Sequence, residues 1–238
     1  MDNYLTEEER RRYSRQIAIE EIGVAGQRRL EESKVFIVGC GALGSMVAMQ
    51  LAGAGVGSIG ISDFDTIDVS NLQRQFFFKT DEAGMKKCLV LQQRMEELNP
   101  SCQVLRCDAL INKEKAVELF SDYDFIVDAT DNPSSKFIIE SVCQQLDKPC
   151  SIAGVSEFHG QVMTVFPGST KFGEVFPDSG NEGFLPCSIG GVVGPAAAIC
   201  ASLQSAEVIK YLTGAGECLK SKLMVFDLLN NSYNVIAI

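Results

Sequence analysis

Short apolar runs alternate with longer amphipathic segments over the first two thirds of the chain. The apolar runs predict strands at residues 35–38, 58–62, 125–127 and 151–153. Apolar positions at helical spacing lie between these runs and predict helices at residues 45–54, 81–98, 113–120 and 134–146. Strands that alternate with helices in this way favour a parallel sheet.

The rhythm of the pattern changes after residue 153. Further strands are predicted at residues 161–166, 223–228 and 233–238, and Asn230 and Asn231 form a turn signal between the last two. A long helix is predicted over residues 195–212, and Gly214 is placed to end it. These late strands read as antiparallel additions to the sheet.

The N-terminal part of the chain is strongly charged. A helix is predicted over residues 6–19, followed by a linker to the first strand. We therefore expect a single α/β domain over residues 1–238, opened by an N-terminal helical segment at residues 1–30. Its core is predicted to be a doubly wound, Rossmann-like, mostly parallel sheet that antiparallel strands extend.

A glycine-rich turn joins the first predicted strand to the helix after it. Gly39, Gly41 and Gly44 form a Gly-x-Gly-x-x-Gly pattern, in which the glycines permit a tight turn, close approach to a phosphate, and close packing of helix on strand. The N–H groups of the helix N-terminus then face the anion. About twenty residues later, Asp63 ends the second strand, where an acid accepts hydrogen bonds from a ribose. The pattern predicts a nucleotide site, which NAD, FAD and ATP can all use.

Two basic side chains and one acid follow in the predicted loops. Arg74 comes after the second strand, Lys87 at the start of a helix, and Asp131 just beyond the apolar strand at residues 125–127. In a doubly wound sheet such positions lie near the carboxyl ends of strands, where ligands bind. We expect the two cations to neutralise a triphosphate and Asp131 to hold a bridging Mg²⁺. A hydride-transfer site needs no such set.

These motifs and their order resemble the adenylating enzymes typified by MoeB, ThiF and HesA and by the adenylation half of ubiquitin-activating enzymes. The resemblance is carried by residues 12–17, the glycine loop, residues 63–65, residues 70–75, Lys87, residues 130–132 and residues 190–195. It implies ATP-dependent adenylation of the C-terminal glycine carboxylate of a small ubiquitin-like sulfur-carrier protein ending in Gly-Gly. The implied carrier is similar to ThiS or MoaD, serving thiamine or molybdopterin sulfur transfer, and pyrophosphate is released.

The resemblance also implies roles for individual residues. It implies Arg15, Arg74, Lys87, Asp131 and Cys187 as the catalytic set, with Arg15 donated by the second subunit of a homodimer and Asp131 as the metal ligand. The implied nucleotide contacts are Gly39, Gly41, Ala42, Asp63, Ser70, Asn71, Leu72, Gln73, Arg74, Lys87, Asp131 and Asn132. ATP and Mg²⁺ are the expected cofactors.

The segment from residue 168 to residue 191 is long, rich in Gly, Pro, Ser and acidic residues, and without periodicity. Such segments are often functional. By resemblance it is a crossover loop that clamps the carrier tail, and Cys187 lies where ThiF-like members carry a cysteine that links to the carrier. A sulfurtransferase or a cysteine desulfurase is a further candidate partner.

The sequence departs from the family pattern in two places. Many relatives carry two Cys-x-x-Cys pairs that bind zinc, and cysteines at that spacing are missing from this sequence, so we expect no zinc. Ala42 stands where relatives often have a further glycine. We also expect no fused sulfurtransferase domain.

Composition limits the remaining possibilities. A net charge of −10 disfavours nonspecific binding to nucleic acid, which depends on clustered Lys and Arg. The N-terminus is charged rather than signal-like, and the longest apolar stretch is too short to span a bilayer. Nine cysteines without paired spacing indicate reduced thiols. We expect a cytoplasmic protein that binds neither nucleic acid nor membrane.

Other interpretations of the same residues remain open. Arg15 could be an ordinary exposed arginine, Asp131 could cap the helix after Pro133, and Cys187 could be a small buried hydrophobe. His159 is interpreted as structural. For the whole chain, the alternatives to adenylation are an NAD(P)-dependent oxidoreductase and a non-catalytic subunit that binds a ubiquitin-like partner.

Overall fold

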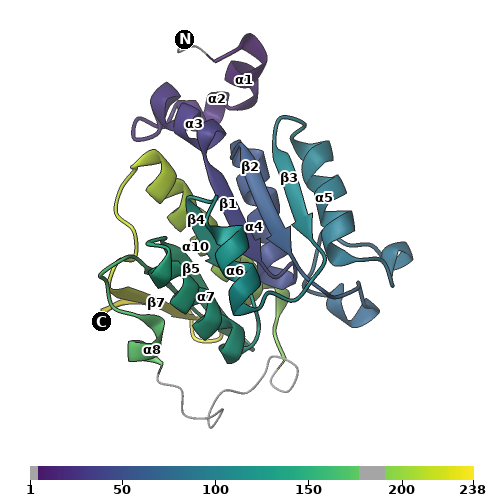
Figure 1. The fold of residues 1–238 in the computed structure, drawn as a ribbon, viewed down its shortest axis with the longest axis vertical. Helices are drawn as coiled ribbons and strands as arrows, with labels where there is room; N and C mark the ends of the chain where they lie inside the picture. The colour runs from purple at the N-terminus through teal and green to yellow at the C-terminus, as the bar shows by residue number, and fades with distance from the viewer. Residues whose placement is uncertain (1–4, 177–190) are drawn as a thin grey trace.

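The computed structural model describes residues 5–176 and 191–238 of the chain. Within them, one eight-stranded sheet forms the centre of the molecule, in the order β3-β2-β1-β4-β5-β6-β7-β8 (Figure 1). The strands are β1 (Lys34–Val38), β2 (Ser58–Ser62), β3 (Gln103–Cys107), β4 (Phe125–Asp128), β5 (Cys150–Ser156), β6 (His159–Val165), β7 (Lys222–Asp227) and β8 (Ser232–Ala237). The pairs from β3 to β5 are parallel and those from β5 to β8 are antiparallel. The predicted fold class is confirmed.

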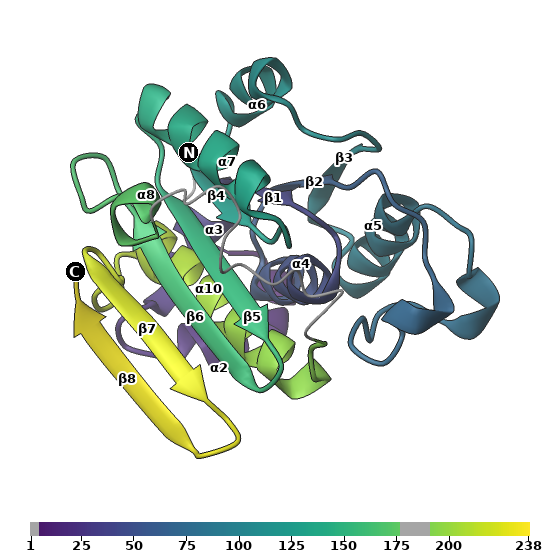
Figure 2. The same cartoon turned by 90° about the horizontal axis from the view of Figure 1, so that it is seen from below.

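Helices cover both faces of this sheet (Figure 2). On one face lie α4 (Ala42–Ala54), α5 (Lys87–Leu98) and α10 (Gly194–Thr213), and on the other lie α6 (Lys113–Phe120) and α7 (Pro133–Gln145). The alternation along β1 explains the two cores, because Val35 and Ile37 pack with the first group of helices while Phe36 and Val38 pack with the second. The helices follow the strands as predicted.

The C-terminal hairpin extends the sheet, and its last strand is exposed to solvent. β7 and β8 pair in register from Lys222 opposite Ala237 to Asp227 opposite Ser232. The turn between them places Asn231 at φ 54°, a conformation that asparagine tolerates better than most residues, which confirms the turn signal. Every residue of β8 is exposed, and the strand forms the outer edge of the sheet in Figure 2.

The N-terminal segment differs from the prediction of one helix and a linker. It forms α1 (Glu7–Arg12), α2 (Ser14–Ile17) and α3 (Gly23–Glu32). The break falls at Tyr13, whose buried side chain reaches inward and accepts a hydrogen bond of 2.8 Å from Asn99 Nδ2. The expected linker is helical because Gln27 and Leu30 are buried against the core that contains α4, α5 and α10. Gln27 Nε2 donates a hydrogen bond to the Ala54 carbonyl.

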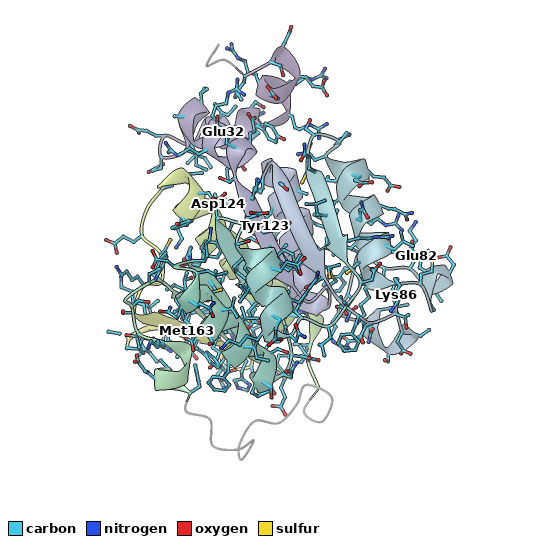
Figure 3. All side chains as sticks on the ribbon, in the orientation of Figure 1. Glu32, Glu82, Lys86, Tyr123, Asp124 and Met163 are labelled. Carbon is cyan, nitrogen blue, oxygen red and sulfur yellow. The ribbon has the colours of Figure 1, made fainter. Side chains whose placement is uncertain are left out.

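These three helices lie at the amino end of the sheet. Glu32, the last residue of α3, and Asp124, just before β4, are both labelled on that side of the molecule in Figure 3. The Asp124 carboxylate accepts a hydrogen bond from the Lys34 N–H at the start of β1. The carboxyl ends of the parallel strands therefore point away from the N-terminal helices.

The helix predicted over residues 81–98 is shorter than expected. The segment before Lys87 contains a 3₁₀ turn at Thr80–Glu82, and Gly84 adopts a φ of 89°. Its backbone then pairs with Ile67, which exchanges hydrogen bonds with Gly84 and Met85. This non-local pairing replaces the first two helical turns. Lys86 and Glu82 at this corner are labelled in Figure 3.

Two further elements were not predicted. Strand β3 carries polar and half-buried residues at the edge of the sheet, so it lacks an apolar run. A short helix, α8 (Phe172–Val175), lies within the expected crossover loop, where Glu140 accepts hydrogen bonds from its first N–H groups. No helix in the described part of the chain is long and apolar enough to cross a bilayer.

Candidate functional site

A cavity of about 930 Å³ opens at the carboxyl edge of the sheet. It lies where β1 and β4 are neighbours, which is the point at which the strand order reverses. Open α/β sheets bind their ligands at this position, because the loops after the two strands run to opposite faces and leave a crevice between them. The predicted residues that line the cavity are Gly39, Gly41, Ala42, Asp63, Asn71, Arg74, Lys87, Asp131 and Asn132.

The glycine loop forms the turn that the sequence predicts. Gly39 has a φ of 95°, and a Cβ there would meet the Ala129 carbonyl oxygen at 2.8 Å. A Cβ on Gly44 would lie 1.8 Å from the Gly39 carbonyl oxygen, so only glycine permits this approach of α4 to the loop. No side chain caps the N-terminus of α4, and its first N–H groups are therefore available to an anion.

Asp63 ties the glycine loop to the end of β2. Its carboxylate accepts hydrogen bonds from the N–H of Cys40 at 2.7 Å and from the N–H of Asp65 at 2.8 Å. A carboxylate has about four acceptor positions, so Asp63 can still accept hydroxyl groups of a ribose. Its place on the cavity wall fits the predicted role.

Lys87 is the most buried cation contributed by the predicted set. Its side chain is 6% exposed, and Nζ lies 3.0 Å from the Asp65 carboxylate, which is itself 48% exposed. This ion pair aims the ammonium group into the cavity from the first turn of α5. Asp65 is a functional neighbour that the candidate list missed, although it stands two residues after Asp63.

Only some residues of the segment 70–75 line the cavity. Arg74 is half-buried on the cavity wall, with Nη1 donating to the Ser70 carbonyl at 3.1 Å. The Ser70 hydroxyl donates a hydrogen bond to Asp68, and this hydrogen bond lowers the pKa of Asp68. Gln73 donates Nε2 to the Val192 carbonyl at 3.3 Å. The structure therefore brings Arg74 and Asn71 to the cavity wall and does not bring Ser70, Leu72 or Gln73 there.

Gln75 also lines the cavity, although it was not among the predicted contacts. It is 4% exposed, and its Oε1 has no hydrogen-bond partner among the described residues. A buried amide oxygen without a partner is costly, and such an atom beside a cavity fits a ligand that donates to it. The residue stands next to Arg74 in the motif, which is the signal that could have identified it.

Asp131 and Asn132 have separate tasks. Asn132 caps α7, because its Oδ1 accepts from the Ser135 N–H at 2.9 Å. The alternative in which Asp131 serves as this cap is therefore excluded. Asp131 is exposed on the cavity wall. Mg²⁺ typically binds one or two protein carboxylates and takes its remaining ligands from phosphates and water, so a single free carboxylate beside Arg74 and Lys87 fits that ion.

Directly beneath Asp131 lies a buried ion pair that the sequence analysis missed. Lys136 Nζ and Asp128 Oδ2 are 3.0 Å apart, with side chains that are 2% and 0% exposed. Lys136 is the fourth residue of α7, and Asp128 is the last residue of β4. A lysine four residues after a helix cap usually faces solvent, so no sequence pattern indicates this pair.

The cavity extends beyond the glycine loop toward the antiparallel strands. This second arm is lined by Ser156, His159, Gln161, Asp227, Ser232 and Asn234. His159 Nε2 lies 3.5 Å from Asp227 Oδ1, and hydrogen bonds from Asn230 are the main cause of a lowered pKa of Asp227. The cavity is also lined by Val155, Val225 and Phe226, so this arm combines polar and apolar side chains, and His159 faces the cavity rather than the core.

Two predicted residues remain, Arg15 and Cys187. Arg15 is exposed on α2, among the helices at the amino end of the sheet and therefore away from the cavity of its own chain. Cys187 lies outside the described residues. Among the described residues, no cysteine lines the cavity.

No group of three or more His, Cys, Asp or Glu side chains that could hold a metal ion occurs within residues 5–176 and 191–238. A Mg²⁺ held by Asp131 would take its other ligands from water and from the phosphate oxygen atoms of a nucleotide.

Comparison with known proteins gives a consistent picture. The ThiF family profile matches residues 13–238. The chain is 36% identical over 240 residues to the probable adenylyltransferase/sulfurtransferase MoeZ of Mycobacterium tuberculosis, covering 98% of this chain and 61% of MoeZ. It is 36% identical over 241 residues to the sulfur carrier protein adenylyltransferase of Thermus thermophilus, covering 98% of this chain and 89% of that protein.

Solved structures share the fold. E. coli MccB with ATP has a TM-score of 0.83 and 23% identity, covering 95% of this chain and 70% of MccB. PaaA has a TM-score of 0.84 and 24% identity, covering 100% of this chain and 76% of PaaA. At this level of identity the likeness concerns the fold alone.

Proposed function

The chain belongs to the ThiF family, and from this premise we propose that it is an ATP-dependent adenylyltransferase. The proposed substrate is the C-terminal glycine carboxylate of a small ubiquitin-like sulfur-carrier protein ending in Gly-Gly. The observation that carries the proposal is the cavity in which the glycine loop, Arg74, Lys87 and Asp131 come together. The relatives MoeZ and the Thermus protein bear the name adenylyltransferase.

The chemistry of adenylation explains this combination of groups. A carboxylate oxygen attacks the α-phosphorus of ATP, its bond to phosphorus forms, and the bond to the β-phosphate oxygen breaks to release pyrophosphate. Both reactants are anions and the leaving group gains charge, so positive groups fixed in place stabilise the transition state. The N-terminus of α4, Arg74 and Lys87 provide that charge. Asp131 would hold a Mg²⁺, which would neutralise phosphate charge further.

The carboxylate is itself the nucleophile, so the reaction needs no serine, histidine or cysteine nucleophile from the protein. The cavity distinguishes adenylation from hydride transfer, because a hydride-transfer reaction has no use for two cations beside a free carboxylate. Cys187 is proposed to act only after adenylation, in a covalent link with the carrier, so Cys187→Ala should leave pyrophosphate exchange unchanged.

The second arm of the cavity supports a peptide substrate. It runs from the nucleotide end to the start of β6 and the turn after β7, lined by hydrogen-bonding side chains. Gly191 and Val193 are hydrogen-bonded to Glu157 in the turn before β6, so the chain returning from residues 177–190 is anchored beside this arm. A Gly-Gly tail is narrow enough to reach the glycine loop along such a path. A ThiS-like or MoaD-like carrier, for thiamine or molybdopterin sulfur transfer, fits this description.

We place the active enzyme as a homodimer in the cytoplasm, with Arg15 completing the site of the partner subunit. The support is geometric, because α2 lies at the amino end of the sheet and the cavity at the carboxyl edge, so the Arg15 of one chain is remote from its own cavity. Co-expression of Arg15→Ala chains with Asp131→Asn chains tests this arrangement. If Arg15 acts across the dimer, each mixed dimer keeps one intact site and regains about half of the wild-type activity, because both lesions then fall on the other site. If Arg15→Ala alone is inactive, a mixture as inactive as either parent would show that Arg15 acts within its own chain.

The central experiment is ATP–pyrophosphate exchange. Exchange of labelled pyrophosphate into ATP should require Mg²⁺ and a carrier protein that ends in Gly-Gly, since the adenylate forms only with the terminal carboxylate. The matched control is the same carrier without its last glycine. Equal exchange with the shortened carrier would reject the proposed substrate, and exchange without any carrier would reject the proposed reaction.

A further inference from the structure

A single ammonium group holds together three backbone segments beneath the cavity. Lys136 Nζ donates to Asp128 Oδ2 at 3.0 Å, to the Thr130 carbonyl at 2.8 Å and to the Ala153 carbonyl at 2.8 Å. These acceptors belong to the end of β4, to the loop after it and to β5. An ammonium group has three N–H donors, so each of them has a protein acceptor.

Asp128 completes the arrangement from the other side. Its Oδ1 accepts from the Thr130 N–H at 2.9 Å and from the Thr130 hydroxyl at 2.6 Å. Thr130 is therefore held at its N–H by Asp128 and at its carbonyl by Lys136. The preceding residue is also fixed, because the Ala129 N–H donates to the Val38 carbonyl at 2.9 Å.

Asp131 is the next residue in the chain. The backbone up to Thr130 has fixed partners on both sides, whereas the Asp131 side chain is exposed on the cavity wall. The rigid unit of Asp128, Thr130 and Lys136 thus fixes the backbone position from which the Asp131 side chain extends. The Ala129 carbonyl also abuts Gly39, so the same unit fixes the glycine loop relative to Asp131.

We propose that Lys136 is a positioning residue that orients Asp131 for the divalent cation of the nucleotide. This inference rests on the proposed function, since it takes Asp131 as the carboxylate that meets the cation. Residues behind a metal ligand that fix its orientation typically change metal affinity by about 10- to 100-fold when removed. Lys136 supplies that support through the Thr130 carbonyl.

The two buried lysines of the cavity differ in what they can reach. Lys87 uses one N–H on the Asp65 carboxylate among the described residues, so its remaining donors can meet a phosphate. Lys136 has no N–H to offer, because the protein already accepts all three. Lys87 therefore contacts the ligand, and Lys136 acts through its neighbours.

The test measures cation binding apart from catalysis. Mn²⁺ replaces Mg²⁺, and its affinity for the complex with α,β-methylene-ATP is measured from the electron paramagnetic resonance signal of free Mn²⁺. Lys136→Met should weaken Mn²⁺ binding about 10-fold or more. Asp131→Asn should do the same, and the double variant should be no weaker than Asp131→Asn alone. Equal Mn²⁺ affinity in Lys136→Met and wild type, or losses that multiply in the double variant, would overturn the proposal.

Lys136→Met leaves the Asp128 carboxylate buried without its cation, which can prevent folding. The variant Lys136→Met with Asp128→Asn removes both charges together and keeps an acceptor for the Thr130 N–H. This pair should fold and still lose Mn²⁺ affinity, because the Thr130 carbonyl remains unanchored. A folded pair with wild-type Mn²⁺ affinity would also overturn the proposal.

Glu207→Gln is the matched control for lost stability alone. Glu207 is buried on α10 and accepts from the Thr164 hydroxyl at 2.7 Å and the Leu219 N–H at 2.6 Å, and it is not among the residues lining the cavity. This variant should melt at a lower temperature and keep the wild-type Mn²⁺ affinity. Failure of the proposed function has a different signature, namely normal Mn²⁺–nucleotide binding with no pyrophosphate exchange for any Gly-Gly carrier.

Discussion

The parallel and antiparallel halves belong to one sheet but differ in how far their side chains are buried. In β2, all five residues are buried, and in β4 all four are. In β8, every residue is exposed, and Tyr233, Val235 and Ile236 are large apolar side chains on its surface. The parallel half is covered by helices on both faces, whereas the edge of the antiparallel half is not.

The difference shows where this fold concentrates function and where it concentrates stability. In the parallel half, β2 and β4 are buried and the cavity lies at the carboxyl ends of the strands, where Asp63, Lys87 and Asp131 line it. The antiparallel half contributes a wall for the cavity through His159 and Asp227 and adds less apolar burial. Substitutions in the strands and at the carboxyl edge should therefore separate stability from activity.

The largest effect is expected from matched Ile→Ala changes in the two halves. Ile61 in β2 is 0% exposed and Ile236 in β8 is 47% exposed. Ile61→Ala should lower the free energy of unfolding by about 2–5 kcal/mol, because it removes buried methylenes and leaves a cavity. Ile236→Ala should change it by less than about 1 kcal/mol. Urea denaturation measures both, and equal losses would mean that β8 is covered in the folded protein.

A second comparison uses two glycines of one helix. Gly44→Ala should cost about 3 kcal/mol, since its Cβ would meet the Gly39 backbone at 1.8 Å and neither side can yield easily. Gly53→Ala in the same helix meets only Leu98 Cδ2 at 3.6 Å and should stabilise the protein by up to about 1 kcal/mol. Gly44→Ala should also weaken nucleotide binding, which calorimetry with α,β-methylene-ATP would show. Wild-type stability and nucleotide affinity in Gly44→Ala would refute the close approach of α4 to the loop.

The smallest effect on stability, with a large one on activity, is expected at the carboxyl edge. Lys87→Ala and Asp131→Asn should each reduce pyrophosphate exchange by about 10² or more, the scale for removing one preorganised charged group. Their melting temperatures should stay close to wild type, because Asp131 is exposed and Lys87 pairs with a half-exposed carboxylate. Unchanged exchange in either variant would remove that residue from the proposed mechanism.

Local signals in the sequence sufficed where a single short segment carries the physical reason. The glycine loop is one case, because its Gly-x-Gly-x-x-Gly spacing is visible in the sequence and the Cβ that Gly44 lacks would meet Gly39 within the same loop. The end of α10 is another, since Gly214 adopts a φ of 75° at its C-cap. Asn132 was identified as a site residue, but its capping of α7 was visible only once the helix start was known.

Non-local contacts explain the sequence predictions that failed. The helix expected over residues 81–98 loses its beginning to backbone pairing with Ile67, and the expected linker becomes α3 because Leu30 packs on a distant core. The contacts of Ser70, Leu72 and Gln73 with a nucleotide stay predictions; these residues do not line the cavity, although Gln73 donates to the carbonyl of Val192, which does. None of these partners is near in sequence, so propensity and spacing could not identify them.

By itself, the sequence determined the alternation of strands and helices, the glycine loop, and the family, because each depends on residue types at short and regular spacing. Only the tertiary structure decided which charges face the cavity. Lys87 and Lys136 are both lysines in the first turns of helices, but Lys87 meets Asp65 across 22 positions, while the three N–H groups of Lys136 are taken by the end of β4, by the loop after it and by β5. The physical reason is that an ammonium group's role depends on which acceptors surround it, and those acceptors are assembled by folding.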